Sequence, residues 1–535
     1  MRKKIRLGIL GFRRGAYLAN IFKQFPGVEI SAGCDIDPQR KERFKEVSQT
    51  AEVYADFEEF LNADFDVLVL ASDCHVHGYQ AIQAMKKGKD IFSEVTAFHT
   101  LGEGVELSRT VEKTKRKYMM AENVNYFPHV LEMERLYNKS NIGKFVHGEC
   151  EYVHDIRYLL LRPDGSKYWR TWFPPIYYCT HSIGPILKIT GERPVSVTGM
   201  IADGKVLPDL RKIDMELALV KTDKNSTIKI LCGYTLPREP VSRWFCMYGT
   251  KGMMESSRWE PEQELYLYEE KARKYRHYTA KHRGNKVKDA HLGADYLTIY
   301  NFLNAYKNNR KMPIDIYKAA DMTLPGILAH RSSLKKREMA IPDFREESIR
   351  KQHEYDFWSP DPDTENQLVM KKKYLNTHLE SRCHKGYNIR AFKQGDEEGW
   401  IKLVNECVGS NYDLNSAQKS LFKSDKFDPK GLFFAVKGKE IAGTACAWSD
   451  KYITGKKCTL HMVAVYPKHR GKGLGYSLSL AVLDYFRKRS SEEVYLRTDD
   501  FRLGAIKSYL DLGFEPVPVN DLHKWRWSKV LEKLK

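Results

Sequence analysis

Short apolar runs alternate with helical stretches through the first part of the chain. The run at residues 67–71 (VLVLA) contains no polar side chain, which is typical of a strand buried on both faces of a parallel sheet. Strands separated by helices at this spacing predict a doubly wound parallel α/β sheet. The predicted strands are residues 5–10, 28–35, 67–71 and 90–94, and the predicted helices are residues 15–25 and 81–87.

The pattern changes near Lys144, where apolar and polar residues begin to alternate along several successive segments. Strands that follow one another with few helices between them predict an open, mostly antiparallel sheet. Helical periodicity returns toward the end of this region, so we expect an α+β domain. The predicted strands are residues 215–220, 227–234 and 245–248, and the predicted helices are residues 294–306 and 318–334.

A proline-rich and acidic stretch, residues 356–363 (DFWSPDPD), interrupts both patterns and precedes a charged segment. We interpret residues 346–385 as a linker or docking arm. Apolar strands resume at residues 432–436, 440–448 and 459–465, which predicts a further α/β domain. The predicted domains are residues 1–122 with the doubly wound sheet, residues 123–345 with an open sheet for substrate binding and oligomerisation, and residues 386–535.

Composition narrows the possibilities. With 535 residues, of which 42% are hydrophobic, the chain is long and apolar enough for several packed cores. It has no apolar run of about 18 residues, so no membrane span is expected. Its first residues lack the features of a signal peptide. The 10 cysteines show no Cys-x-x-Cys pair, which indicates reduced thiols in the cytoplasm and no metal site.

The formal charge of +19 comes from basic residues that are scattered among acidic ones. This distribution is typical of a solvated, lysine-rich surface, and it also allows electrostatic steering of anionic small molecules. The sequence contains no recognised nucleic-acid-binding module, so we expect no nucleic acid partner.

A glycine turn, with Gly8, Gly11 and Gly15, follows the first strand and precedes a helix, where backbone N–H groups can hold phosphate. Asp35 ends the second strand, where an acid binds ribose hydroxyls and favours NAD over NADP by repelling a 2′-phosphate. Arg13 replaces the middle glycine of the G-x-G-x-x-G pattern, which leaves an ordinary strand-to-helix turn as the alternative. The candidate cofactor-binding residues are Gly8, Gly11, Arg13, Arg14, Gly15 and Asp35.

Three runs resemble the Gfo/Idh/MocA oxidoreductases: ASDCHVH at residues 71–77, EVT at residues 94–96 and IPDF at residues 341–344. The resemblance covers residues 3–345 and implies a Rossmann NAD-binding domain followed by an open-sheet substrate domain. Because the open sheets of this family commonly pair face to face, the resemblance also implies a homo-oligomer.

The same resemblance adds His75, Glu94 and Asn123 to the cofactor-binding candidates. In ordinary dehydrogenases of the family, a lysine follows the glutamate and helps to position and deprotonate the substrate alcohol. Val95 stands at that position here, which argues against simple dehydrogenase chemistry.

Three further stretches are similar to the NAD-dependent glycosidases of this family, the N-acetylgalactosaminidase-like branch, which also lacks the lysine. In that branch a tyrosine and a histidine perform acid–base work. The motif match assigns the histidine to His181 and the tyrosine to Tyr152, with Tyr178 as a further catalytic candidate. The stretches are AENVNY at residues 121–126, GECEYVHDIR at residues 148–157 and YCTHSIGP at residues 178–185.

The chemistry of that branch begins when NAD removes a hydride from carbon 3 of a sugar. The resulting ketone acidifies the proton on carbon 2, the substituent on carbon 1 leaves, water adds and the hydride returns. Simpler interpretations remain open for each candidate: His181 could cap a helix, Tyr152 could pack within a strand, and His75 could be a solvated loop residue.

A second glycine turn, RGKGLG at residues 470–475, lies between an apolar strand at residues 460–467 and a helix. Several backbone N–H groups and the charges of Arg470 and Lys472 meet there, which suits a pyrophosphate.

This turn and the segment at residues 498–514 (TDDFRLGAIKSYLDLGF) resemble the GNAT acetyltransferases, over residues 387–518. The resemblance implies acetyl-CoA as cofactor, Tyr509 as the acid that protonates the departing thiolate, and pairing of residues 462–465 with the pantetheine arm. A degenerate domain that only binds CoA is the alternative. The candidate residues are Val463, Val465, Arg470, Gly471, Lys472, Gly473, Leu474 and Gly475.

Together these features predict a bifunctional enzyme that carries out NAD-dependent redox chemistry on a sugar and transfers an acetyl group to an amine, with a sugar or amino sugar as substrate. One alternative is a plain NAD-dependent sugar dehydrogenase fused to an acetyltransferase with a separate substrate. The other is a nucleotide-binding regulator whose first half has lost catalysis.

Overall fold

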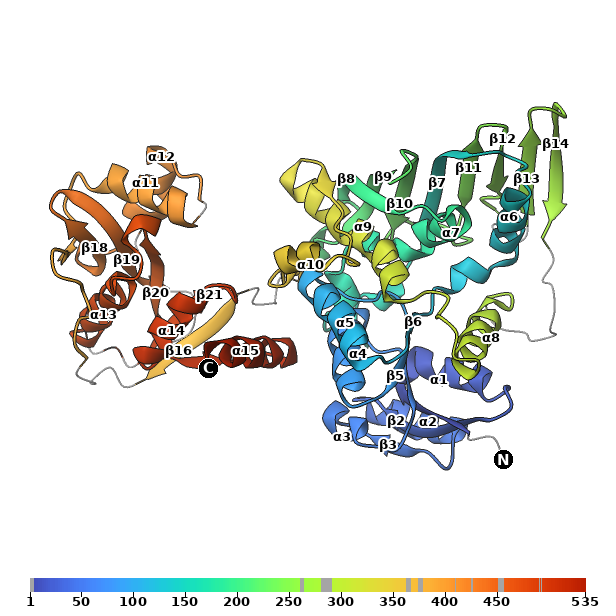
Figure 1. Cartoon of the computed structure of the whole chain (residues 1–535), viewed down its shortest axis with the longest axis horizontal. Coiled ribbons are helices and arrows are strands. Elements are labelled where there is room, and N and C mark those ends of the chain that lie inside the picture. Colours follow the sequence, from blue (N-terminus) through green and yellow to red (C-terminus); the bar gives the residue numbers. More distant parts are fainter. Residues whose placement is uncertain are drawn as a thin grey trace. The chain divides into compact units, whose positions relative to one another are not determined.

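In the computed structural model the chain forms two compact units, Met1–Thr364 and Glu365–Lys535 (Figure 1). Two sheets lie in the first unit and one in the second. Within the part of the chain that the structure describes, no helix is both long and apolar enough to cross a bilayer. The described residues are 4–259, 264–280, 291–361, 367–373, 379–408, 410–424, 427–450, 457–489, 491 and 493–535.

The first sheet is parallel throughout, with the strand order β3-β2-β1-β4-β5-β6. Since β1 is central, the glycine turn after it opens at the carboxyl edge, where ligands bind in doubly wound sheets. The predicted doubly wound sheet is confirmed, and every residue of β4 is buried. The strands are β1 (Ile5–Leu10), β2 (Val28–Cys34), β3 (Glu52–Tyr54), β4 (Val67–Leu70), β5 (Asp90–Ser93) and β6 (Tyr118–Met120).

The helices of this domain begin earlier than the apolar spacing predicted. The first starts at Phe12 because the chain turns at Gly11, whose φ of 86° suits glycine. Gly15, the predicted start, lies inside that helix, and a Cβ there would be 2.7 Å from Cγ2 of Ile9. The helices are α1 (Phe12–Phe22), α2 (Pro38–Val47), α3 (Phe57–Leu61), α4 (His77–Lys86) and α5 (Leu101–Thr114).

The second sheet is open and mostly antiparallel, as predicted, with the order β14-β13-β12-β11-β7-β10-β9-β8-β15. Only the β7–β10 pair among the described strands of this sheet is parallel. The strands are β7 (Phe145–Val153), β8 (Pro194–Asp203), β9 (Ile213–Thr222), β10 (Thr227–Gly233), β11 (Phe245–Gly249), β12 (Gly252–Ser256), β13 (Glu264–Glu269), β14 (Lys274–Thr279) and β15 (Met339–Ala340).

Helices connect the second sheet back to the first. Helix α7 packs on β7 and β10, and α9 packs on β8. Helix α8 instead lies beside α1 (Figure 1), where Phe302 meets Phe22 and Phe92 with ring centroids 6.4 and 5.1 Å apart. Helix α8, which follows the second sheet in the chain, therefore packs against the first sheet and its helix α1. The helices are α6 (Pro128–Asn138), α7 (Thr180–Thr190), α8 (Ala294–Lys307), α9 (Ile316–Lys335) and α10 (Glu347–His353).

The second unit has one mixed sheet with the order β17-β18-β19-β20-β21-β16-β22. Two hydrophobic cores lie between this sheet and its helices. One contains side chains of α13, α14 and α15, and the other surrounds Trp400 of α11. The strands are β16 (Leu368–Lys373), β17 (Asn388–Ala391), β18 (Leu432–Lys437), β19 (Glu440–Asp450), β20 (Lys457–Val465), β21 (Glu493–Thr498) and β22 (Glu515–Val517); the helices are α11 (Glu397–Val408), α12 (Leu414–Ala417), α13 (Leu474–Arg487), α14 (Leu503–Asp511) and α15 (Asp521–Leu534).

The segment predicted as a linker, residues 346–385, contains α10 and β16. Strand β16 pairs with β21 and β22, inside the sheet of the second unit. Leu368, Met370 and Lys372 form its buried side. The run of three lysines concealed this strand from sequence reasoning, because a lysine-rich segment ordinarily indicates a solvated surface.

Candidate functional site

A cleft of about 1310 Å³ lies at the carboxyl edge of the first sheet. Gly11 and Asp35 line it. A Cβ at Gly11 would stand 2.5 Å from the carbonyl oxygen of Ala71, so a side chain there collides with backbone. The Asp35 carboxylate accepts hydrogen bonds from the backbone N–H of Phe12 (2.7 Å) and of Asp37 (2.9 Å), which hold it at the end of β2.

Gly8 and Gly15 are not among the residues that line this cleft. A Cβ at Gly8 would lie 2.8 Å from the ring of Phe65, and Gly15 packs against Ile9. Both glycines therefore serve close packing beneath the turn, while Gly11 shapes the cleft itself. The sequence pattern could not separate the two uses, because each requires the same small residue.

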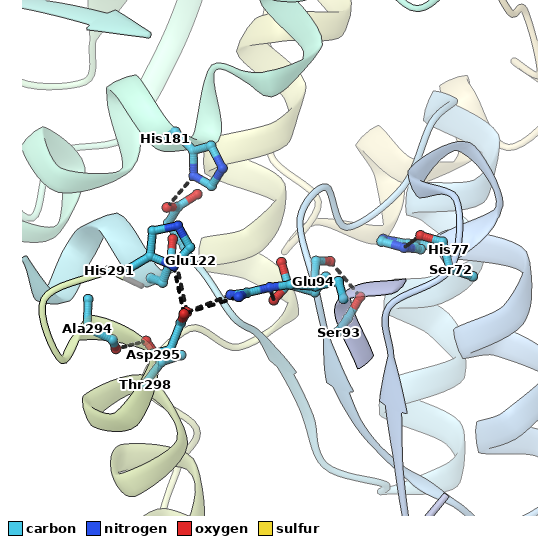
Figure 2. A network of polar contacts seen from close by, with 12 residues as sticks. Ser72, His77, Ser93, Glu94, Glu122, His181, His291, Ala294, Asp295 and Thr298 are labelled. Carbon is cyan, nitrogen blue, oxygen red and sulfur yellow. Dashed lines mark hydrogen bonds and ion pairs between the residues drawn. The ribbon is translucent and has the colours of Figure 1, made fainter. Parts of the chain in front are cut away.

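Glu94, His291 and Asp295 belong to a network of charges (Figure 2), in which Arg14 is the central cation. The Arg14 guanidinium donates to Glu94 (3.1 Å) and, through two nitrogens, to Asp295 of α8 (2.6 and 3.1 Å). Asn123 also donates to Asp295 (2.9 Å), and His291 Nδ1 lies 2.7 Å from it. Three of the predicted cofactor-binding residues, Arg14, Glu94 and Asn123, thus meet at an aspartate that sequence reasoning missed.

This network keeps the Asp295 carboxylate ionised. Burial opposes its ionisation, but hydrogen bonds from His291 and Arg14 and their charges outweigh burial and hold its pKa well below the usual value. The network joins α1, the end of β5 and α8. Because Arg14 and Glu94 also line the cleft, the network ties one wall of the cleft to α8.

Four aromatic side chains meet next to the cleft. The ring centroid of Tyr152 lies 4.9 Å from that of His181 and 6.4 Å from that of Tyr178. Tyr178 lies 5.8 Å from His181 and 5.7 Å from Tyr234. The structure therefore brings together the three predicted catalytic residues of the first unit and adds Tyr234. Tyr178 also lines the cleft, so this tyrosine cluster borders the cofactor end.

His181 is held by a buried glutamate (Figure 2). Its Nδ1 lies 2.8 Å from Oε1 of Glu122, which also accepts the backbone N–H of Val124 at 3.1 Å. Glu122 is fully buried. Because Nδ1 is engaged, Nε2 is the nitrogen that remains for proton transfer. His181 stands in the first turn of α7, but its ring bonds to Glu122 and does not cap the helix.

The tyrosines stay protonated at neutral pH. Burial raises the pKa of Tyr152, with the charges of Arg243 and Arg170 opposing it, and burial likewise raises the pKa of Tyr178. His154 Nδ1 lies 3.2 Å from the Tyr152 hydroxyl, and burial lowers the pKa of His154 to about 4. A neutral phenol hydrogen-bonded to a neutral imidazole is a group able to donate a proton.

Arg170 lines the cleft beside Tyr178 and was missed by the sequence reasoning. Its guanidinium stacks over Trp169, 4.3 Å from the ring centroid. No carboxylate in the described ranges forms an ion pair with it. A cation in a cleft without an acidic partner is placed to attract negative charge on a ligand.

The histidines after β4 are not solvated loop residues. His75 lines the cleft and packs among aromatic rings, 5.4 Å from Trp172, and burial lowers its pKa. His77 opens α4 and is buried, with its ring nitrogens 3.1 Å from the carbonyl oxygens of Thr96 and Ser72 (Figure 2). His75 is therefore available to the cleft, and His77 fixes the loop.

The second glycine turn lies between β20 and α13. Gly471 and Gly473 have φ values of 74° and 69°, which suit glycine. Gly473 caps α13, whose first N–H groups have no intrahelical partner and suit an anion. Lys472 Nζ donates to the Tyr387 hydroxyl at 2.9 Å, and Arg470 is exposed, with its Nε 3.2 Å from the Val465 carbonyl oxygen.

Strands β20 and β21 pair only over a short register within the described chain, at Cys458–Val494 and Thr459–Tyr495. Beyond these pairs lie Val463 and Val465, near Met462, whose φ is 51°. Tyr509 is buried in α14, and burial raises its pKa to about 12. A strand edge, an anion-binding turn and a protonated tyrosine thus occur in one unit.

Three family models match the chain. Residues 5–122 match the oxidoreductase family with an NAD-binding Rossmann fold. Residues 207–351 match the C-terminal domain of glycosyl hydrolase 109, and residues 399–514 match the acetyltransferase (GNAT) family.

Curated relatives resemble the first part of the chain. A glycosyl hydrolase family 109 protein of Shewanella pealeana and the alpha-N-acetylgalactosaminidase of Shewanella oneidensis are each 26% identical over 395 residues, which covers 64% of this chain and 85% of each relative.

Solved structures show the same fold. Levoglucosan dehydrogenase with NADH and levoglucosan has a TM-score of 0.56 at 15% identity over 64% of this chain and all of the other (100%). An oxidoreductase from Agrobacterium radiobacter with NAD+, L-tartaric acid and magnesium has a TM-score of 0.53 at 14% identity, over 63% and 99% of the two chains. At this identity the likeness concerns the fold alone. By the family models, the chain joins an NAD-binding Rossmann domain of the Gfo/Idh/MocA type and a region that matches the glycosyl hydrolase 109 C-terminal domain to a GNAT domain.

Proposed function

We propose that the first unit cleaves a glycosidic bond of a sugar or amino sugar by NAD-dependent chemistry without net redox change. The observation that carries this proposal is the Glu122–His181 pair within the tyrosine cluster, at the border of the cofactor cleft. Val95 is buried where ordinary dehydrogenases of the family have a lysine, so the acid–base groups available are His181 and the tyrosines.

The cleft fits NAD by its own geometry. Gly11 leaves room for a pyrophosphate beside the first turn of α1, and Asp35 holds a carboxylate where ribose hydroxyls bind. His75 and Tyr178 border the end of the cleft that faces the substrate. Bound NAD would supply the acceptor and then the donor of a hydride.

The side chains around the cleft would then accept and donate protons and stabilise developing charge. His181 Nε2 accepts a proton from the substrate, and the Glu122 carboxylate stabilises the imidazolium that forms. Tyr152 and Tyr178 remain neutral phenols because burial raises their pKa, so either can protonate a leaving group. Arg170 stabilises negative charge that develops on a substrate oxygen.

The test is to incubate the purified protein with aryl glycosides of hexoses and N-acetylhexosamines and to measure both the released aglycone and NADH. We expect aglycone release without NADH accumulation. Accumulation of NADH with free sugars instead identifies a plain sugar dehydrogenase. If neither reaction occurs although NAD binds, the first unit is a regulator and the proposal fails.

We propose that the second unit transfers an acetyl group from acetyl-CoA to an amine, with an amino sugar as the substrate class. The turn from Arg470 to Gly475 would hold the pyrophosphate, and β20 at Val463 and Val465 would pair with the pantetheine arm. Tyr509, protonated because burial raises its pKa to about 12, would protonate the departing thiolate.

Gly475 offers a sharp test because a Cβ there meets nothing within 4 Å. Gly475→Glu adds a negative charge at the turn without a backbone collision, whereas Gly475→Ala adds only a methyl group. We expect acetyl transfer from acetyl-CoA to be lost in the first variant and kept in the second. Equal activity of both variants would remove the turn from the cofactor site.

We further propose that the second sheet pairs with that of another copy in a homo-oligomer. Met200 of β8, Leu219 of β9 and Tyr248 of β11 are exposed at 66%, 54% and 42%. Exposed apolar side chains grouped on one sheet are typical of an interface. Native mass spectrometry should show a dimer or larger assembly that Leu219→Lys dissociates; a monomeric parent protein would contradict the pairing.

A further inference from the structure

One face of helix α7 extends from the tyrosine cluster to a second cavity. His181, Gly184 and Lys188 lie three and then four residues apart, and so share that face. Lys188 lines a cavity of about 580 Å³. The residues that line this second cavity are all different from those that line the cofactor cleft.

Between His181 and this second cavity lie three buried polar atoms without a hydrogen-bond partner in the described chain: Oε2 of Glu122 and both amide atoms of Asn125. Both side chains are fully buried. Gly184 lies against them, since a Cβ there would be 3.3 Å from Asn125 Oδ1 and from Glu122 Cγ. Buried polar groups that lack protein partners are the groups that hold internal water, which typically makes about three hydrogen bonds.

Asn125 also lines the second cavity, at the end nearest Glu122. The opposite part of the lining reaches the surface, because Asp223, Lys318 and Arg345 are exposed. Arg345 pairs with Asp321 at 2.7 Å, and Lys188 pairs with a glutamate of α6. A wall of this polarity retains water, whereas an apolar cavity of similar size can stay dry.

We propose that internal water bound by Glu122 and Asn125 forms a proton path between His181 and solvent, through the second cavity. The path explains why Glu122 keeps one oxygen for His181 and leaves the other buried without a protein partner. The glycine at position 184 lets both side chains pack close to α7, since a Cβ there would be 3.3 Å from each and would displace them.

The proton transfers balance along this path. His181 takes a proton at Nε2 and passes the proton of Nδ1 to Oε1 of Glu122, which becomes a neutral carboxylic acid. Rotation of the carboxyl group carries that proton to the position of Oε2. The water at Asn125 accepts it there and releases another proton through the cavity, which leaves Glu122 ionised again and His181 neutral with its proton on Nε2. When the Nε2 proton is given back to the substrate, the same transfers in reverse restore the proton on Nδ1.

The need for this path rests on the proposed function, in which an alcohol of the substrate loses a proton as it becomes a ketone. Plain dehydrogenation releases that proton to solvent, whereas glycoside cleavage without net redox change takes a proton back when the hydride returns, so the path would carry protons in both directions. The path itself is a property of the folded chain, and it can be measured without substrate or NAD.

The test follows the Nδ1 proton of His181 by NMR in the full chain labelled with ¹⁵N-histidine. Asn125→Leu keeps the volume and removes the amide. We expect it to slow exchange of this proton with solvent by about tenfold, the equivalent of one lost buried hydrogen bond. Lys318→Met, at the exposed end of the same cavity, is the matched control and should leave the exchange rate unchanged.

Gly184→Ala provides a second variant, because its methyl group enters the space beside Asn125 and is compatible with a helix. It should slow exchange in the same way, and it decides the question if Asn125→Leu does not fold. Exchange at the parent rate in a folded variant would overturn the path. A crystal structure without water at Glu122 Oε2 would do the same, whatever the glycosidase assay shows.

Discussion

The two glycine turns of this chain share a backbone design but use their side chains differently. In the turn after β1, the Arg14 side chain forms hydrogen bonds with Glu94 and Asp295. After β20, Arg470 is exposed and forms no ion pair among the described residues. The arginine of the first turn therefore joins α1 to α8, whereas the arginine of the second turn is left facing solvent.

The difference shows why a motif can depart from its pattern without losing its site. Gly11 alone must be glycine to open the cofactor cleft, since a Cβ would meet the Ala71 carbonyl oxygen. Arg14 is free to take a structural role, while Arg13 is exposed at the cleft. In the second turn both Gly471 and Gly473 have positive φ, so its pattern is more constrained.

The largest expected effect separates the chemistry of the two units. His181→Ala removes the base of the first unit and should lower glycoside turnover by about 100- to 10,000-fold. Acetyl transfer should be unchanged. Tyr509→Phe should do the reverse, with about a 100-fold loss of acetyl transfer. Steady-state assays of both reactions on both variants check this, and a loss of both activities in either variant would contradict separate sites.

The second largest effect is the difference in stability lost when the arginine of each glycine turn is replaced. Arg14→Met leaves the buried carboxylate of Asp295 and the half-buried one of Glu94 without their cation and should destabilise the first unit by about 3–5 kcal/mol. Arg470→Met, at an exposed position, should change stability by less than about 0.5 kcal/mol. Urea unfolding checks both, with the transition of the first unit identified as the one that NAD shifts. If Arg14→Met lowers the free energy of unfolding as little as Arg470→Met does, Arg14 is dispensable for the fold.

A smaller effect distinguishes the glycines. Gly11→Ala places a Cβ against backbone at a positive φ and should weaken NAD binding by about tenfold, through a strain of about 1–3 kcal/mol. Gly475→Ala, in open space, should leave acetyl-CoA affinity within about twofold. Isothermal titration of each cofactor measures both affinities. Unchanged NAD binding in Gly11→Ala would place the dinucleotide elsewhere.

The smallest effect is the response of the first unit to acid. Because the pKa of Asp295 is held below its unfolded value, its ionised form contributes stability that is present above about pH 4. That contribution is lost as the pH falls from there through the folded pKa. The stability gap between the parent protein and Asp295→Asn should therefore narrow below pH 4 in urea titrations. A gap that is constant with pH would contradict this origin.

The sequence indicated candidate site residues but not the contacts between them. His181 and Tyr178 come from one stretch and Tyr152 from another, and the structure brings the three together. Glu122, inside the quoted stretch at residues 121–126, and Asp295, inside the predicted helix at residues 294–306, were not among the candidates. Nothing in the spacing of residues indicates that Glu122 meets a histidine 59 positions later in the chain.

What the sequence determined by itself is local. The apolar periods predicted the two sheets of the first unit, and the glycines between strand and helix predicted where each unit has its turn. These features depend on neighbouring residues, because strand and helix patterns and positive φ angles act over a few positions.

Only the tertiary structure decided which of these residues act on one another. The sheet that incorporates β16, the Asp295 network and the packing of Gly184 against Glu122 and Asn125 each join segments that are far apart in the chain. Their energies come from burial and from paired charges, which exist only when the layers pack. For that reason the chemistry of each candidate was readable from its residue type, while its partner and protonation state were not.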